Sequence, residues 1–222
     1  MGQCSVRKVR RRNGPLAGDR LDECYAARLL ERQDALQAEA DRLVELLDLK
    51  AMLGRAGRFK RLGSSVSGLM AWRDLDLGVS CGGLSREMAW ETVIPLATHP
   101  RTTRLSYRNE VGRLAPPELR GYGRYYFVVR HETEAGREWK IDISLWSPKS
   151  PPGPLTHAQE MRRRLTPETR LAILWIKDAW HRLPSYPDVV GGTDIYEAVL
   201  KHGVRTPEQF GRYLRRRGLP AP

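Results

Sequence analysis

Apolar residues recur at helical spacing over the first quarter of the chain. The stripe is built on a heptad repeat that three further leucines widen: Leu29, Leu36 and Leu43, with Leu30, Leu46 and Leu47. Gly54 and Gly57 supply a stop. The pattern predicts one long helix from about Leu21 to Leu53. Its heptad spacing permits a dimeric coiled coil, but we favour docking onto the domain that follows.

From residue 58 to residue 146 the pattern alternates between apolar and polar, as is typical of strands. We expect five strands and two helices here: strands at 58–63, 75–81, 102–111, 124–133 and 137–146, and helices at 67–72 and 84–97. Residues 124–146 have the pattern of a hairpin with its turn at Glu134–Gly136. This stretch predicts a small α/β domain with a mixed sheet.

A proline-rich stretch, SPKSPPGP, begins at Ser147, and neither a helix nor a strand can cross it intact. Beyond it we expect helices at 157–164, 166–182, 192–202 and 206–217, two of them opened by Thr-Pro at Thr166 and Thr206. The predicted fold class is therefore α+β, in five parts: a disordered basic tail (1–20), a long helix (21–57), the α/β domain (58–146), a linker (147–155) and a helical domain (156–222).

Composition and charge limit the classes of protein to which this sequence can belong. Lys and Arg exceed Asp and Glu by 38 − 26 = 12, and the run RKVRRR at 7–12 adds to a field that attracts nucleotides or nucleic acid. No apolar run approaches a membrane span, and the N-terminus lacks a signal-peptide pattern. Cys4, Cys24 and Cys81 show no CxxC spacing. We expect a cytoplasmic protein without a membrane partner.

The candidate chemistry lies on two of the expected strands. Asp74 and Asp76 project side by side from one strand face, where two carboxylates repel each other unless a cation neutralises them. Mg²⁺ accepts such hard oxygen ligands together with substrate phosphates. Asp142, in WKIDISLW, occupies the same kind of polar strand face. Asp178 or Glu132 is the alternative third acid if the strand order differs from the expected one.

Upstream of the aspartates, Gly63-Ser64-Ser65 lies between a strand and a helix. A glycine permits close backbone approach, and the N–H groups and hydroxyls that follow it suit phosphate oxygens, so Ser64 and Ser65 are both candidates.

Over about residues 58–146 the chain resembles the DNA polymerase beta-like nucleotidyltransferase superfamily. The features that carry the resemblance are a Gly-Ser turn, a short helix, an Asp-Leu-Asp strand and a later strand that bears an Asp. The resemblance implies that Gly63 and Ser64 hold a triphosphate. It also implies that Asp74, Asp76 and Asp142 bind divalent metal, Mg²⁺ or Mn²⁺, and that Asp142 helps to activate the acceptor hydroxyl. The C-terminal helices resemble the helical domain that often closes the cleft in this superfamily. We add Lys140 and Lys177 as expected triphosphate-binding bases, with Lys60, Arg61 and Arg170 as further candidates.

The predicted function is therefore metal-dependent transfer of a nucleotide from an NTP, expected to be ATP, to a hydroxyl acceptor (EC 2.7.7-type). Because the chain is basic, we favour an RNA or tRNA acceptor, as for some nucleotidyltransferase toxins, and disfavour polycationic aminoglycosides. A lincosamide-type antibiotic acceptor and a non-catalytic nucleotide- or RNA-binding protein stay open. The sequence leaves the oligomeric state undetermined.

Overall fold

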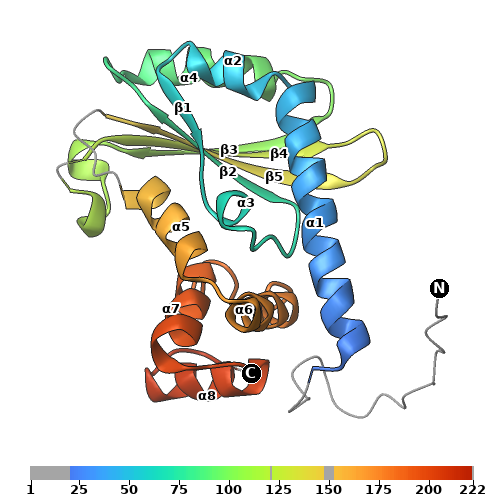
Figure 1. Ribbon diagram of the computed structural model, residues 1–222. Coiled ribbons are helices and arrows are strands. Elements are labelled where there is room, and N and C mark those ends of the chain that lie inside the picture. Colours follow the sequence, from blue (N-terminus) through green and yellow to red (C-terminus); the bar gives the residue numbers. More distant parts are fainter. Residues whose placement is uncertain (1–20, 121, 148–152, 222) are drawn as a thin grey trace. The chain divides into compact units, whose positions relative to one another are not determined.

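The structure, a computed structural model, describes residues 21–120, 122–147 and 153–221 (Figure 1). The predicted basic tail and residues 148–152 of the predicted linker lie outside the described residues. Two compact units divide the chain. One runs from Leu36 to Arg164, and the other joins the described residues up to Ala35 to those from Leu165 onward. The predicted five-part division stays a prediction, and these units cut the chain at other points.

The Leu36–Arg164 unit is built on a five-stranded mixed sheet. Its strands are β1 (Arg58–Arg61), β2 (Asp74–Ser80), β3 (Thr102–Glu110), β4 (Arg124–Glu132) and β5 (Glu138–Trp146). They lie in the order β1-β2-β5-β4-β3. β2 and β5 are parallel, whereas the other three pairings are antiparallel. The predicted α+β class with a mixed sheet is confirmed, and so is the hairpin of β4 and β5.

Helices cover both faces of this sheet. α2 (Leu49–Gly54) and α4 (Arg86–Ala97) lie on one face, and α3 (Ser64–Ser67) and α5 (Gly153–Arg164) lie on the other (Figure 1). The first face carries the core: Leu75, Leu77, Phe127, Ile141 and Ile143 are buried there against the helices. Two short 3₁₀ turns, Gly112–Leu114 and Pro117–Leu119, follow β3.

The long N-terminal helix α1 (Glu23–Leu46) docks as expected, because Leu36, Ala40 and Leu43 are buried in the core of the sheet unit. The prediction of one helix to Leu53 was wrong in one respect. The chain turns at Asp48, whose φ is 46°, and resumes as α2. Leu46, expected on the buried stripe, is 72% exposed at the end of α1.

The second unit holds α6 (Pro167–Trp180), α7 (Gly192–His202) and α8 (Pro207–Arg216). Thr166 and Thr206 cap α6 and α8 by accepting from the backbone N–H groups of Thr169 and Gln209, as the Thr-Pro starts predict. The rings of Trp180 and Phe210 pack edge to face in its core. Within the described ranges no helix has the length and apolar character needed to cross a membrane.

Candidate functional site

The parallel pairing of β2 with β5 brings the three predicted aspartates together. In its register Asp76 lies opposite Asp142, and Asp74 lies opposite Lys140. All four side chains project from the sheet face that does not carry the core, because Leu75, Ile141 and the other alternating residues are buried on the opposite face. The arrangement gathers three carboxylates and one ammonium on two adjacent strands.

The alternative third acids lie elsewhere. Glu132 is an exposed residue at the far end of β4. Asp178 belongs to the helical unit, where it accepts a hydrogen bond from Tyr25 at 2.5 Å and pairs with Arg32. The strand order therefore favours Asp142 as the partner of Asp74 and Asp76.

Lys140 links two of the carboxylates. Its Nζ donates to Asp142 Oδ2 at 2.7 Å and to Asp74 Oδ1 at 3.1 Å. Burial lowers the pKa of Lys140, but the two carboxylates outweigh burial and leave that pKa above its ordinary value. The ammonium therefore stays charged and neutralises part of the acidic cluster.

Asp142 is held from a second side by Tyr126 on β4. The Tyr126 hydroxyl donates to Asp142 Oδ2 at 2.5 Å. Burial and the charge of Asp142 raise the pKa of Tyr126, so the phenol keeps its proton and remains a donor. The other carboxylate oxygen, Oδ1, is buried with no hydrogen-bond partner among the described residues. A buried, unpartnered carboxylate oxygen is costly unless something binds it.

The turn before α3 lies close to the carboxylate cluster at Gly63. Gly63 has φ +59°, and a Cβ at this position would overlap the Asp76 carboxylate, so only glycine fits. The Ser65 hydroxyl donates to the Leu62 carbonyl at 3.0 Å and the Ser67 hydroxyl to the Gly63 carbonyl at 3.3 Å. Ser64 is the remaining hydroxyl of the turn. The short helix begins at Ser64 rather than at Ser67 as predicted, because the turn at Gly63 already starts it.

These residues fit a divalent metal by the chemistry of their donors. Asp74, Asp76 and Asp142 with Lys140 carry a formal charge of 1 − 3 = −2, which a dication would balance. The unpartnered Oδ1 of Asp142 offers a free ligand atom. Within the described ranges, however, no three acidic, His or Cys side chains are gathered closely enough to hold a metal, and Lys140 lies between Asp74 and Asp142. Metal binding thus requires Lys140 Nζ to leave this pair.

Of the predicted triphosphate-binding bases, Lys140 is the one that forms ion pairs with Asp74 and Asp142. Lys177 is a buried residue of the helical unit, where its Nζ donates to the Tyr196 hydroxyl at 3.3 Å. Arg61 pairs with Asp41, and Arg170 pairs with Asp34 at 3.4 Å. Lys60 lies on β1, opposite Gly78 of β2.

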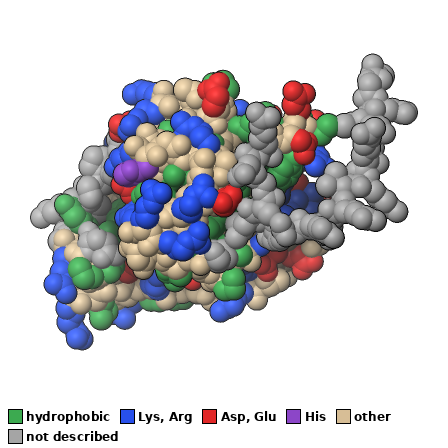
Figure 2. Space-filling model, turned by 90° about the horizontal axis from the view of Figure 1, so that it is seen from below, with side chains coloured by type: hydrophobic (Ala, Val, Ile, Leu, Met, Phe, Trp, Pro, Cys, Tyr) green, Lys and Arg blue, Asp and Glu red, His purple; other side chains and the backbone are tan. Residues whose placement is uncertain are grey.

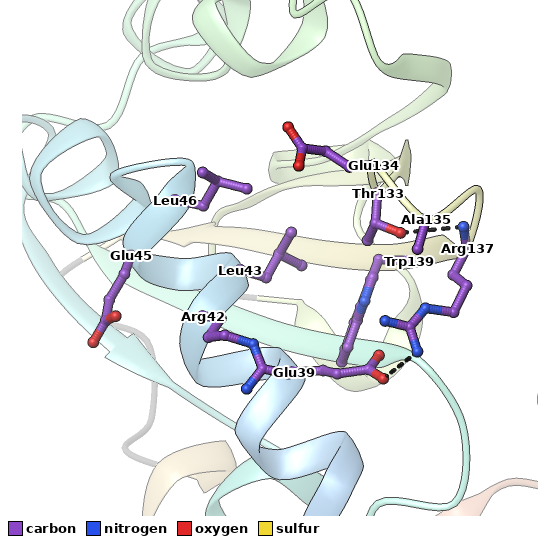
Figure 3. Close-up of a pocket in the computed structure, with 10 residues that line it drawn as sticks. All are labelled: Glu39, Arg42, Leu43, Glu45, Leu46, Thr133, Glu134, Ala135, Arg137 and Trp139. Carbon is purple, nitrogen blue, oxygen red and sulfur yellow. Dashed lines mark hydrogen bonds and ion pairs between the residues drawn. The ribbon is translucent and has the colours of Figure 1, made fainter.

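A separate cavity of about 550 Å³ opens between α1 and the β4–β5 hairpin (Figure 3). Leu43 and Trp139 line it together with charged residues, among them Glu39, and none of the three aspartates is in its lining. Glu39 also bonds to Arg73, the residue before Asp74, at 2.8 Å. The cavity and the carboxylate cluster therefore lie on opposite faces of the sheet, since Trp139 belongs to the core face.

Sequence reasoning missed Tyr126 as a partner of Asp142. Tyr126 alternates with the buried Tyr125 and Phe127, so the sequence predicts that its side chain lies on the polar face of the strand. Its place beside Asp142, however, depends on the pairing of β4 with β5. The expected hairpin contains this signal, because the register puts Tyr126 opposite Ser144, two residues from Asp142.

No known protein-family model matches the chain, and no curated protein matches it in sequence. Solved structures do match. Cid1 poly(U) polymerase with MgGTP bound is 15% identical with a TM-score of 0.47, over 72% of this chain and 48% of that one. CdnC of E. coli MS115-1 with ATP is 14% identical with a TM-score of 0.49, over 87% and 72%. Terminal uridylyl transferase 4 from Trypanosoma brucei with bound UPU is 16% identical with a TM-score of 0.44, over 88% and 60%.

The chain spans about half the length of the poly(U) polymerase. At these identities and TM-scores the likeness assigns no activity to this chain. The geometry of the carboxylate cluster carries the proposal that follows.

Proposed function

We propose that this protein is a divalent-metal-dependent nucleotidyltransferase, which transfers the nucleoside monophosphate of an NTP to a hydroxyl acceptor. The observation that carries the proposal is the meeting of Asp74, Asp76 and Asp142 on the parallel strands β2 and β5, beside the Gly63–Ser65 turn. This is the set of residues and the order of elements that the resemblance to the DNA polymerase beta-like superfamily predicts. ATP is the expected donor, and Mg²⁺ or Mn²⁺ the expected metal.

The chain's own residues divide the work. Asp74 and Asp76 would hold the metal, with Asp142 completing the site. When bound, the metal would neutralise charge on the triphosphate and lower the pKa of the acceptor hydroxyl. Gly63 lets the backbone lie close to Asp76, and the Ser64 hydroxyl would donate to a phosphate oxygen. Lys140 would contribute its positive charge to the triphosphate once it leaves the aspartates. Tyr126 keeps Asp142 in position.

RNA is the acceptor that we favour. The formal net charge of +12 attracts a polyanion. In the helical unit, exposed basic side chains on and beside α8, including Arg205, Arg212, Arg215 and Arg216, add to a surface rich in Lys and Arg (Figure 2). Four basic residues, His202, Arg212, Arg216 and Arg217, line an open groove of about 740 Å³ with Tyr213. A lincosamide-type acceptor or a purely nucleotide-binding role remains an outcome of the test below.

The test is incubation of the protein with MgCl₂, total RNA and each of the four NTPs labelled at the α-phosphate. We expect label on RNA with one preferred NTP. Asp74→Ala should lower this labelling by on the order of 10³-fold, because removal of one group that stabilises transition-state charge costs roughly that much.

Asp188→Asn serves as the matched control, since Asp188 is an exposed acid of the other unit, and it should label RNA as the wild type does. Equal labelling by the wild type and Asp74→Ala would refute the catalytic role of the cluster. Mg²⁺-dependent NTP binding with no labelled acceptor would instead support a non-catalytic nucleotide-binding protein.

A further inference from the structure

A row of alternating arginine and aromatic side chains crosses the sheet face that carries the carboxylates. Arg108 on β3, Tyr126 and Arg124 on β4, and Trp146 on β5 form this arginine–aromatic row. The guanidinium carbons of Arg108 and Arg124 each lie 4.7 Å from the centroid of the Tyr126 ring. Arg124 also lies 4.9 Å from the Trp146 ring. The strand register produces the row, because Arg108 lies opposite Tyr126 and Arg124 lies opposite Trp146.

The row adjoins the candidate catalytic acid directly. The hydroxyl of Tyr126, at its centre, donates a hydrogen bond to Asp142. By the resemblance stated above, Asp142 is the acid next to the acceptor hydroxyl. A molecule lying along the row would therefore have one end at the carboxylate cluster.

The two arginines differ in how their charges are satisfied. Arg124 forms an ion pair with Glu110, which is buried at the end of β3. Arg108 is exposed, and its guanidinium has no ion pair or hydrogen bond among the described residues. Its cation–π contact with the Tyr126 ring instead holds the guanidinium beside the ring and leaves its N–H donors free. Such a group suits a phosphate oxygen or the face of a base.

We propose that the arginine–aromatic row binds the acceptor as a single-stranded RNA end, with Arg108 contacting a phosphate or stacking on a base near the terminal hydroxyl. This rests on the proposed function and assigns the acceptor side of the same site. A positively charged row repels polycationic acceptors and matches the phosphodiester backbone. Aromatic and guanidinium planes add stacking that tolerates any base.

The test measures RNA binding apart from catalysis. The probe is a fluorescein-labelled single-stranded RNA of roughly 12 nucleotides, followed by fluorescence anisotropy without NTP. Arg108→Gln should weaken its binding about tenfold, the loss expected for one stacking contact. Arg104→Gln is the matched control, because Arg104 is also exposed and lies on the same face of β3, four residues away. It should change the affinity less than about twofold, since screening leaves a distant single charge little effect.

Arg108→Lys separates charge from stacking. It keeps the positive charge but loses the planar guanidinium, so it should recover only part of the lost affinity. Calorimetric binding of Mg·ATP should be the same in the wild type and in all three variants. This second readout tells the two proposals apart: absent ATP binding in every protein would defeat the proposed function, whatever the RNA result.

Equal losses of RNA affinity in Arg108→Gln and Arg104→Gln would overturn the inference, because net charge alone would explain them. Unchanged binding by Arg108→Gln would also overturn it. A DNA strand of the same sequence gives a third arm. Equal affinity for DNA would support a backbone-binding row but overturn its assignment to RNA.

Discussion

Lys140 decides how the carboxylate cluster behaves at the scale of single residues. Its ammonium forms ion pairs with both Asp74 and Asp142, and both N–O distances are no longer than 3.1 Å. Three acids crowded on two strands would otherwise repel one another. A metal bound at the proposed site would compete with Lys140 for these oxygens, so we expect Lys140 to link folding stability to metal binding.

Lys140→Met should therefore destabilise the protein by about 1–3 kcal/mol in EDTA, the cost of leaving partly buried acids without a partner. Added MgCl₂ should raise the melting temperature of this variant more than that of the wild type, because the competing cation is gone. Differential scanning fluorimetry over a MgCl₂ titration measures both effects.

Lys60→Met is the control for Lys140→Met, since Lys60 lies on β1, next to β2, and forms no ion pair with an acid among the described residues. Its response to MgCl₂ should match the wild type. A Lys140→Met protein whose melting temperature ignores MgCl₂ would show that the cluster does not bind the metal.

His131 should make the folded protein less stable at acidic pH. It is almost fully buried on β4, its Nδ1 has no hydrogen-bond partner in the described structure, and its ring packs against His99. Burial, with His99 and Arg101 nearby, lowers the pKa of His131 below its ordinary value of 6.5. The unfolded chain then binds more protons, so the stability that neutral His131 contributes is present above pH 6.5 and is lost as the pH falls through the folded pKa.

Urea unfolding at pH 7.5 and at pH 5 measures this effect, and His131→Gln should show a smaller loss of stability between the two pH values. His181 will still contribute, because burial lowers its pKa as well. An identical pH dependence in the wild type and His131→Gln would contradict the assignment.

At the scale of elements, the turn between β1 and α3 is the least tolerant part of the candidate site. Gly63 combines a positive φ with a position where an added Cβ would overlap the Asp76 carboxylate. Gly63→Ala should cost about 1–3 kcal/mol of stability through strain, and should remove nucleotide transfer by displacing Asp76. Chemical denaturation and the RNA-labelling assay check the two results.

Gly54→Ala is the control for Gly63→Ala, because Gly54 is a glycine within a helix, α2. No atom lies within 4 Å of a Cβ added at Gly54, so this change should be neutral or stabilise the protein by about 0.4–1 kcal/mol. Transfer activity at the wild-type level in Gly63→Ala would contradict the close approach of this turn to the site.

The alternation of apolar residues predicted the strands well, because each strand buries one face in the core. Leu75 and Ile141 mark the buried face, and Asp74, Asp76 and Asp142 the open one. Periodicity could not predict that β2 and β5 are adjacent and parallel, since this pairing joins residues about 66 positions apart. Nor could it predict the break at Asp48, where an Asp adopts a positive φ that helical spacing does not reveal.

At the scale of the whole molecule, charge is the property that bears most on the acceptor. Part of the net charge of +12 lies in the run RKVRRR at residues 7–12, outside the described residues. Each phosphate contact on a single strand contributes about 0.7 to the slope of log affinity against log salt. Deletion of residues 1–12 should flatten this slope for RNA binding if the run contacts the backbone.

Anisotropy titrations of RNA at several NaCl concentrations give this slope for the full chain and for the deletion variant. The tenfold effect of Arg108→Gln should persist in the deletion variant, because the arginine–aromatic row belongs to the sheet unit. If the deletion leaves the slope unchanged, the basic run does not contact the RNA.

The central claim is that the Asp74, Asp76 and Asp142 cluster transfers a nucleoside monophosphate, and the fate of the two ends of the triphosphate tests it most directly. The protein is incubated with its preferred NTP, labelled in parallel reactions at the α- and the γ-phosphate, together with MgCl₂ and the acceptor. We predict α-label on the acceptor, γ-label in pyrophosphate and neither product with Asp74→Ala. Transfer of the γ-label to the acceptor, or equal products from the wild type and Asp74→Ala, would contradict the account.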